Sequence, residues 1–397
     1  MSLNKVGEVR LAGGDRAGAL SAYEEALAIR RKLAAADPRN AQWQRELSVS
    51  LHNVGDVQLA AGDRASALSA YEEGLTIIRK LASANPGNAG RQRDLSVSLE
   101  RVGEVRLAAG DRTGALSAYE ESLAVARKLA AADPGNAAWQ RDESVGLNKV
   151  GEVRLAAGDR AGALSAYEES LAIRRKLAAS DPGNAEWQRD VGVSLERVGD
   201  VRMSAGDRAG ALSAYEESLA IRRQLAASDP GNAEWQRDVS LSLDRVGDER
   251  QTAGDRAGAL LFYEEGLAIR RKLATADPGN AGWQRDLSLS LDRVGDVRMS
   301  AGDRTGALSA YEESLAIRRK LAAADPGNAG WQTDLVLSLS RVGDVSGPPR
   351  TRAALREALA IVEALARDNR LTASQENWAQ AIRGVLAKLP PEAAEAR

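Results

Sequence analysis

The stretch from Asn184 to Asp229 decides the fold, because most of the chain consists of near copies of it. It reads NAEWQRDVGVSLERVGDVRMSAGDRAGALSAYEESLAIRRQLAASD. Its tyrosine recurs every 48 residues, at Tyr23, Tyr71, Tyr119, Tyr167, Tyr215, Tyr263 and Tyr311. A glycine of the first half recurs with the same period, at Gly7, Gly55, Gly103, Gly151, Gly199, Gly247, Gly295 and Gly343. A fixed period of this size predicts a stacked array of repeated units instead of one globular core.

The composition excludes most chemistry that needs a metal or a thiolate. The chain has 397 residues, no cysteine and a single histidine, His52. Zinc sites and histidine-based catalytic pairs need residues that such a chain lacks. No apolar run approaches the roughly 20 residues of a membrane span, and the N-terminus lacks the apolar core of a signal peptide. We therefore expect a cytoplasmic protein without enzymatic activity, cofactor, metal or membrane contact.

Each 48-residue unit is predicted to form two helices. In the fourth unit, Asn136 can accept a hydrogen bond from a free amide of the first helical turn. Gly158 is suited to end that helix, because glycine adopts positive φ without strain. Asp159 can cap the second helix in the same way, and Pro182 stops it. Each helix should contain about 20 residues and extend about 30 Å.

This pattern resembles the tetratricopeptide repeat, in which a helix pair carries a Leu-Gly in the first helix and an Ala/Tyr spacing in the second. The third unit shows the matching residues, which are Leu99, Val102, Gly103, Gly110, Asp111, Ala115, Tyr119 and Leu123. The resemblance implies an all-α fold, an α-solenoid (superhelix) of antiparallel helix pairs. Two features depart from it. The period is 48 residues instead of 34, and Arg106 occupies the place of an aromatic residue.

The two ends of the array are irregular. Residues 1–389 are expected to form one solenoid, with seven regular units, a degenerate C-terminal unit and a capping helix over about 373–388. That capping helix places Trp378, Ile382, Val385 and Leu386 on one side. It should cover the last apolar face, as solenoids require for solubility. We expect the tail, residues 390–397, to lack regular structure.

Two positions of the first helix are candidates for partner binding. The residue after the repeated glycine is acidic in every copy, and the residue three positions before it varies between copies. By the resemblance, the first helices line a concave face on which ligands lie. The candidate residues are Glu100, Glu104, Asn148, Glu152, Glu196, Asp200, Asp244, Asp248, Asp292 and Asp296. We expect them to bind a basic or polar protein segment, and expect the side chains of Asp244, Asp248, Asp292 and Asp296 to be exposed. The competing interpretation is a solvated surface, in which Arg101, Arg197, Arg245 and Arg293 each neutralise the acid three residues further on.

A second row is basic and lies in the second helix. It includes Arg30-Arg31-Lys32, Arg174-Arg175-Lys176, Arg270-Arg271-Lys272 and Arg318-Arg319-Lys320. Such a row can contact nucleic acid phosphates. With a net charge of −2, however, the chain has no overall attraction for nucleic acid. We therefore favour pairing with the helix dipole and with the Glu-Glu of adjacent units, and expect no nucleic acid partner.

Four residues at three places depart from the repeat. The pair Leu261 and Phe262 replaces Ser-Ala in the sixth unit, either as an apolar interface or as local compensation in packing. Arg91 replaces a tryptophan that anchors other junctions, which predicts a looser junction after the second unit. His52 is interpreted as a surface residue.

An extended surface without catalytic groups favours a protein-interaction scaffold. One alternative is the regulatory or sensor arm of a larger enzyme or signalling protein. The other is a self-associating structural protein, because near-identical units with exposed ends can stack or form homo-oligomers.

Overall fold

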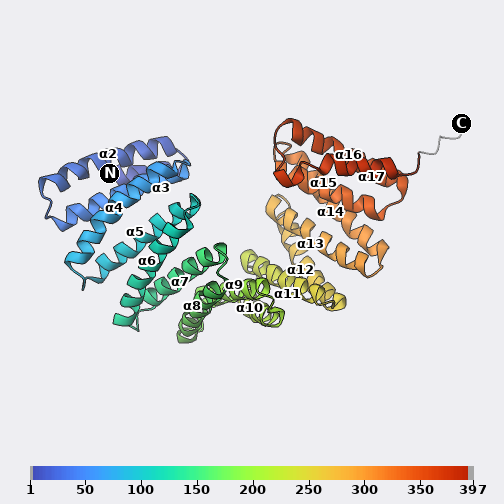
Figure 1. Ribbon diagram of the computed structural model, residues 1–397. Helices are drawn as coiled ribbons and strands as arrows, with labels where there is room; N and C mark the ends of the chain where they lie inside the picture. Colours follow the sequence, from blue (N-terminus) through green and yellow to red (C-terminus); the bar gives the residue numbers. More distant parts are fainter. Residues whose placement is uncertain (1–2, 392–397) are drawn as a thin grey trace. The chain divides into compact units, whose positions relative to one another are not determined.

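The computed structural model describes residues 3–391, and its regular structure in this range is entirely helical (Figure 1). The chain divides into two compact units, Met1–Ala211 and Leu212–Arg397. In each unit, successive helices lie side by side in antiparallel pairs joined by short turns (Figure 1). The predicted all-α, tetratricopeptide-like solenoid is therefore confirmed.

From residue 3 onward, the N-terminal unit contains nine helices, and a tenth extends across the boundary between the two units. They are α1 (Leu3–Ala12), α2 (Arg16–Ala36), α3 (Ala41–Ala60), α4 (Arg64–Ala84), α5 (Ala89–Ala108), α6 (Arg112–Ala132), α7 (Ala137–Ala156), α8 (Arg160–Ser180), α9 (Ala185–Ser204) and α10 (Arg208–Ser228).

The C-terminal unit continues the same alternation. Its elements are α11 (Ala233–Thr252), α12 (Arg256–Ala276), α13 (Ala281–Ser300), α14 (Arg304–Ala324), α15 (Ala329–Val345), α16 (Pro348–Arg367), the 3₁₀ helix η1 (Ala373–Gln375) and α17 (Trp378–Lys388). Odd-numbered helices up to α15 are the first helices of their repeats, and even-numbered ones are the second helices.

The helix ends form where the sequence places capping residues. Asn136 accepts a hydrogen bond from the Trp139 amide at the start of α7, and Asp159 accepts one from Gly162 at the start of α8. Between these helices Gly158 has a φ of +88°, a conformation that costs glycine little. The interpretations of Asn136, Gly158 and Asp159 are confirmed.

A tyrosine of the second helix packs directly on the first helix of the same repeat. A Cβ atom at Gly103 of α5 would lie only 2.6 Å from Cε1 of Tyr119 in α6. No side chain fits in that space, so the 48-residue recurrence of glycine and tyrosine reflects one close contact. Tyr119 is 3% exposed. The two helices of a repeat therefore pack closely because one of them lacks a side chain at this point.

The apolar cores lie between repeats as well as within them. In the N-terminal unit, Ala19, Tyr23 and Leu27 of α2 form one cluster with Leu51 and Val57 of α3. Each second helix is thus buried against the first helix of the following repeat. No repeat buries its apolar residues alone, which is the stacking that the period predicts.

The C-terminal end differs from the expected helix over about 373–388. Thr372 and Gln375 form a capping box around η1, so the α-helix begins only at Trp378. Ile382 is buried, and Trp378 packs on the last core cluster. Val385 is 47% exposed, so its predicted place on the packed side is wrong. The expected tail, 390–397, lies mostly outside the described residues.

Replacing Arg91 with tryptophan should slow amide hydrogen exchange in α4 and α5. Arg91 is the third residue of α5, where α7 has Trp139, and it donates a 3.5 Å hydrogen bond to the Leu81 carbonyl. A fully buried aromatic side chain stabilises a protein by about 1.5–3 kcal/mol, and a half-buried tryptophan should stabilise the junction by less than this. Exchange followed by mass spectrometry measures the effect, with the exposed Arg39→Trp as control. Unchanged exchange in α4 and α5 would contradict a weak junction.

Candidate interaction surface on the first helices

In the second, sixth and seventh repeats, the acid that follows the repeated glycine is bound by a tyrosine of its own repeat and by an arginine of the next. Asp248 of α11 accepts a 2.6 Å hydrogen bond from the Tyr263 hydroxyl and pairs with Arg293 of α13. Burial, followed by the Asp248 carboxylate, raises the pKa of Tyr263 well above its usual range, so the hydroxyl remains a donor.

The same arrangement recurs in both units of the chain. Asp296 binds Tyr311 at 2.7 Å and Arg341 at 3.1 Å, and in the N-terminal unit Asp56 pairs with Arg101. In the competing interpretation, each arginine neutralises the acid three residues further along its own helix, and this is wrong for Arg101 and Arg293. They instead join adjacent repeats, because neighbouring first helices lie side by side.

Two of the candidate acids are buried counter-ions. Asp292 of α13 pairs with Arg318 of α14 at 2.6 Å, and the side chains are 5% and 2% exposed. Asp244 pairs with Arg270 at 2.7 Å in the preceding repeat. The expectation that Asp244 and Asp292 are exposed is wrong. So is the interpretation of Arg270 and Arg318 as surface residues of a basic row, because the first arginine of each triplet points into the helix pair.

In these two repeats the residue at the variable position, three residues before the repeated glycine, pairs with the residue 26 positions later in the same helix pair. In the sixth and seventh repeats that later residue is arginine and the variable residue is aspartate, whereas in the first, fourth and fifth repeats an arginine there accompanies Asn4, Asn148 and Glu196. In the third repeat the later residue is Ala126, and Glu100 lacks an arginine partner there. Burial raises the pKa of Glu100, whose carboxylate accepts a 3.2 Å hydrogen bond from Ser122. Asn148 is also buried, at 7% exposure. A helix-pair register applied to the sequence would have revealed the pairs Asp244–Arg270 and Asp292–Arg318.

The other candidate acids lie nearer to solvent. Glu104 is half exposed and pairs with Lys149 of the next repeat at 2.5 Å. Glu152 and Asp200 are exposed, and Glu196 is half buried. The first-helix surface is therefore a network of paired charges, and only part of the predicted acidic row is accessible.

His52 lies inside a helix pair, so its interpretation as a surface residue is wrong. His52 occupies the variable position of the second repeat, and its ring faces Gly74. The missing side chain of Gly74 leaves room for the ring, because a Cβ atom added to Gly74 would lie 3.1 Å from the His52 Nε2 atom. The Nε2 atom is buried without a hydrogen-bond partner among the described residues. Burial, with the nearby Arg101 charge, lowers the pKa of His52 from 6.5 to about 4.

The second helices are joined by a ladder of exposed ion pairs. In six second helices, the second residue of the basic triplet or its counterpart pairs with the second glutamate of the next Tyr-Glu-Glu, or with the equivalent Glu357 in the last repeat, as predicted. These pairs are Arg31–Glu73, Arg79–Glu121, Arg127–Glu169, Arg223–Glu265, Arg271–Glu313 and Arg319–Glu357. The first glutamate binds an arginine of the next first helix, at the place where the resemblance expects an aromatic residue. Examples are Arg106–Glu72 and Arg298–Glu264.

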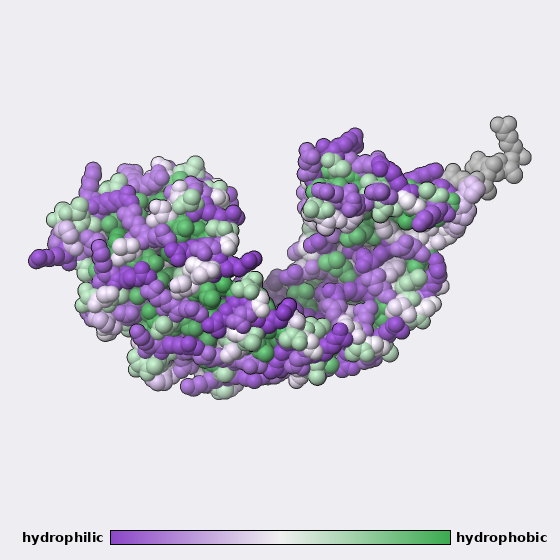
Figure 2. Space-filling model, viewed as in Figure 1, coloured by the Kyte–Doolittle hydropathy of each residue, from purple (hydrophilic) through white to green (hydrophobic). Residues whose placement is uncertain are grey.

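A cavity of about 390 Å³ opens on the first-helix surface of the C-terminal unit, between α11, α13 and α15. Leu289 and Leu337 form apolar walls and are 38% and 39% exposed. Four carboxylates and three guanidinium groups also line it. Elsewhere, hydrophilic residues cover most of the visible surface, with hydrophobic residues in narrow strips between them (Figure 2). The cavity therefore has apolar walls, and its lining carries a net formal charge of −1.

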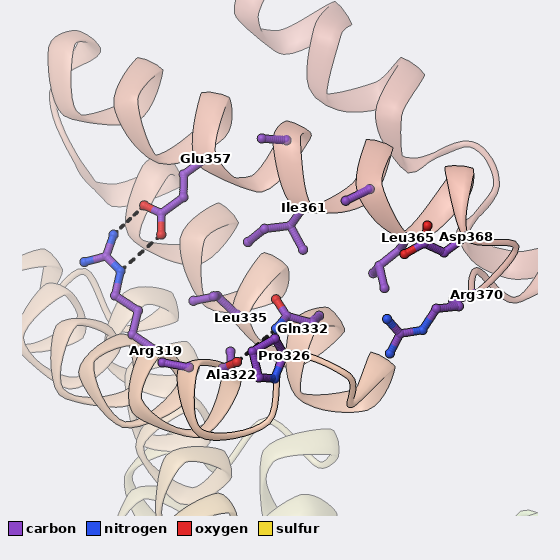
Figure 3. Close-up of a pocket in the computed structure, with 13 residues that line it drawn as sticks. Arg319, Ala322, Pro326, Gln332, Leu335, Glu357, Ile361, Leu365, Asp368 and Arg370 are labelled. Carbon is purple, nitrogen blue, oxygen red and sulfur yellow. Dashed lines mark hydrogen bonds and ion pairs between the residues drawn. The ribbon is translucent and has the colours of Figure 1, made fainter.

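A second cavity of about 600 Å³ lies between α14, α15 and α16 (Figure 3). Ile361 and Leu335 lie across it, and the Arg319–Glu357 ion pair closes one end. At the other end Arg370 donates a hydrogen bond to the Gly327 carbonyl. Arg319 binds its glutamate here as in the regular repeats, so even the degenerate last repeat keeps the ladder.

The apolar pair of the sixth repeat divides between two environments. Phe262 lies beneath the Arg250 guanidinium, 5.0 Å from the ring centroid. Leu261 is 69% exposed. Phe262 thus supports local packing, and Leu261 remains the only member of the pair accessible to a partner.

Within residues 3–391, no group of three or more His, Cys, Asp or Glu side chains has an arrangement that could hold a metal ion. None of the described helices combines the length and apolar character needed to cross a membrane.

The chain is similar to solved structures of other proteins. The apo form of RapI is 12% identical, with a TM-score of 0.54 over 98% of each chain. BtubC (BKLC) from P. vanneervenii is 19% identical over 64% of this chain and 90% of BtubC, with a TM-score of 0.49. The C-terminal part of a TPR repeat-containing protein from Cytophaga hutchinsonii is 13% identical over 83% and 98% of the two chains, with a TM-score of 0.46.

Neither a protein-family model nor a curated protein matches the sequence. The repeated helix pairs and the likeness to RapI show that the chain has the tetratricopeptide-repeat type of fold.

Asp292→Asn should destabilise the C-terminal unit by about 3 kcal/mol, because it leaves Arg318 as a buried charge without its counter-ion. Asp296→Asn should cost only about 0–1 kcal/mol, since that side chain is 43% exposed. Urea unfolding and hydrogen exchange in α13–α15 measure both. Losses of equal size would contradict the buried role of Asp292.

NMR titration of the single histidine should give a midpoint near pH 4. The folded pKa of His52 lies below its value of 6.5 in an exposed state, so protonation favours unfolding. The stability from keeping the ring neutral is complete above about pH 6.5 and is lost as the pH falls toward 4. The full difference between the two pKa values corresponds to about 3 kcal/mol in the free energy of unfolding. His52→Gln should remove this pH dependence. A midpoint above pH 6 would show that the ring is solvated.

Proposed function

We propose that the protein is a non-catalytic interaction scaffold that binds a segment of another protein on the first-helix surface of its C-terminal unit. The observation that carries this proposal is the cavity with Leu289 and Leu337 as walls. Half-exposed leucines at the same position of successive repeats give a partner apolar contact at regular intervals. Cavities of this size suit one side chain of a bound segment.

The charge of the lining favours a basic side chain in the cavity. Oδ1 of Asp248 accepts from Tyr263 and Arg293, whereas Oδ2 makes no hydrogen bond with the described residues. A carboxylate accepts up to about four hydrogen bonds, so Asp248 can bind a further donor. A lysine or arginine could place its aliphatic stem against the leucines and its charge at Oδ2. The exposed acids Glu152 and Asp200 support the same preference along the N-terminal unit.

A peptide-binding experiment tests the proposal. Fluorescent peptides of one length, with leucine and either lysine, glutamine or glutamate at alternating positions, are titrated with the intact chain. Binding should follow the order lysine, glutamine, glutamate, and should weaken with salt. Asp248→Asn should reduce lysine-peptide affinity up to about fivefold, the worth of one exposed pair. Leu289→Asn should reduce the affinity for lysine and glutamine peptides alike.

Glu376→Gln is the matched control, because Glu376 is an exposed acid of the same unit outside this surface. Equal binding of the three peptides, or equal effects of Asp248→Asn and Glu376→Gln, would place the partner site elsewhere.

A further inference from the structure

The junction between the first and second repeats lacks an arginine that other junctions use to bind a glutamate. In the regular repeats, the first glutamate of the Tyr-Glu-Glu pairs with an arginine of the next first helix. These pairs are Glu72–Arg106, Glu120–Arg154, Glu168–Arg202, Glu216–Arg250 and Glu264–Arg298. The corresponding glutamate of α2 is Glu24, and Gln58 of α3 stands in place of the arginine. Among the described residues, Glu24 forms neither an ion pair nor a hydrogen bond.

A cavity of about 620 Å³ lies at this junction, between α2, α3 and α4, and we name it the Gln58 pocket. A cavity of about 420 Å³ lies at the same place two repeats later, between α6, α7 and α8. All ten residues that line the smaller cavity have counterparts in the Gln58 pocket, and nine of these are identical. The tenth position holds Arg154 in the smaller cavity and Gln58 in the larger one. The larger volume therefore accompanies the loss of the arginine side chain.

The acceptors that hold this arginine elsewhere are present in the Gln58 pocket. Arg106 donates to the Glu72 carboxylate at 2.7 Å and to the Gly114 carbonyl at 3.4 Å. The counterparts of these two acceptors are the Glu24 carboxylate and the Ser66 carbonyl, and both residues line the pocket. An arginine that enters the pocket therefore meets the same two acceptors.

A second substitution accompanies the loss of the arginine. A Cβ atom at Gly162 would lie 3.0 Å from Cδ of Arg154, so glycine at this position leaves room for the arginine stem. Six repeats have glycine there, and the second repeat, which lacks the arginine, has Ser66. Gln58 does not replace the arginine as a donor to the glutamate, and its Oε1 atom is buried without a hydrogen-bond partner among the described residues.

The charge of the pocket favours a cation. Arg31 pairs with Glu73 at 2.5 Å, which leaves Glu24 as the uncompensated charge among the lining residues. The formal charge of the lining is therefore −1, whereas Arg154 brings that of the regular cavity to zero.

We propose that the Gln58 pocket binds an arginine side chain of a partner protein. The guanidinium group lies beside Glu24 and donates to its carboxylate and to the Ser66 carbonyl. Arginine fits these two acceptors better than lysine, because its planar group presents several N–H donors in fixed directions. Its aliphatic stem packs against Ala28 and Ala70, which line the pocket.

The Gln58 pocket is an internal feature of the N-terminal unit, since α1 packs on α2 and α5 packs on α4. It shares no residue with the cavity that has Leu289 and Leu337 as walls. Arginine binding here therefore does not depend on the function proposed for the C-terminal unit.

Fluorine NMR of the full chain tests the pocket. Because the chain has no cysteine, Ser69→Cys accepts a single trifluoromethyl label at the pocket. The labelled protein is titrated with N-acetyl-arginine amide and with its citrulline analogue, a neutral molecule of nearly the same shape. Arginine amide should shift the label saturably and bind about fivefold more tightly than the citrulline analogue, the upper value for one exposed ion pair. N-acetyl-lysine amide should bind less tightly than arginine amide.

Two variants remove the site in different ways. Gln58→Arg restores the regular pair with Glu24 and should abolish the response to arginine amide. Glu24→Gln keeps the space and should make the affinities for arginine and citrulline amides equal. Asp248→Asn is the control, because Asp248 lines the C-terminal cavity, and it should leave the titration unchanged. Circular dichroism checks that each variant remains folded.

The regular junction allows a test by gain of binding. With the label at Ser165→Cys, the counterpart of Ser69, the regular cavity should not respond to arginine amide. Arg154→Gln together with Gly162→Ser reproduces the lining of the Gln58 pocket and should create the response there.

The absence of a saturable shift with arginine amide at the Ser69→Cys label overturns the proposal. So does equal or tighter binding of the citrulline or lysine amide, or a response that survives Gln58→Arg. A titration altered by Asp248→Asn, or a regular junction that stays silent after both substitutions, has the same consequence.

Discussion

The close approach of a tyrosine ring to a glycine backbone sets the geometry of each helix pair. Any side chain at Gly103 would displace the Tyr119 ring, and the position recurs with the 48-residue period. The ring fills the space between the helices, and in several repeats its hydroxyl reaches the acid beside the glycine, as Tyr263 reaches Asp248. That acid in turn binds an arginine of the next repeat. One contact within a pair thus fixes where the connection to the neighbouring pair begins.

Sequence reasoning succeeded where a residue acts locally. Asn136, Gly158 and Asp159 could be placed from their own conformational and hydrogen-bonding preferences, because caps and turns depend on residues a few positions apart. The repeat period then supplied the stacking without knowledge of any contact. The two helices of each pair were predicted with lengths close to those of α7 and α8.

Prediction from the sequence failed where the partner of a residue lies on another helix. Asp292 looked like an exposed acid because its own helix gives no sign of Arg318, which is 26 residues away and buried with it. Likewise, the sequence suggests that Arg101 pairs with Glu104, three residues further along its own helix, whereas stacking brings Asp56 of the previous repeat to Arg101. His52 looked like a surface residue because histidine is polar, but the pocket beside Gly74 holds it away from water. The accessible part of the candidate surface could therefore be identified only with the helix pairs in place.

The distribution of matched residues has a consequence for how such a chain can change over generations. The pairs that differ between repeats, such as Asp244 with Arg270, lie within one 48-residue segment and would be copied together. The ion pairs between second helices, such as Arg271 with Glu313, are chemically the same at successive junctions. A duplicated segment would thus keep the contacts that lie within it. Its second helix could form the same kind of ion pair with the repeats on either side. The number of repeats can drift by unequal recombination without creating a mismatched junction, and array length becomes a property that selection can adjust independently of repeat sequence.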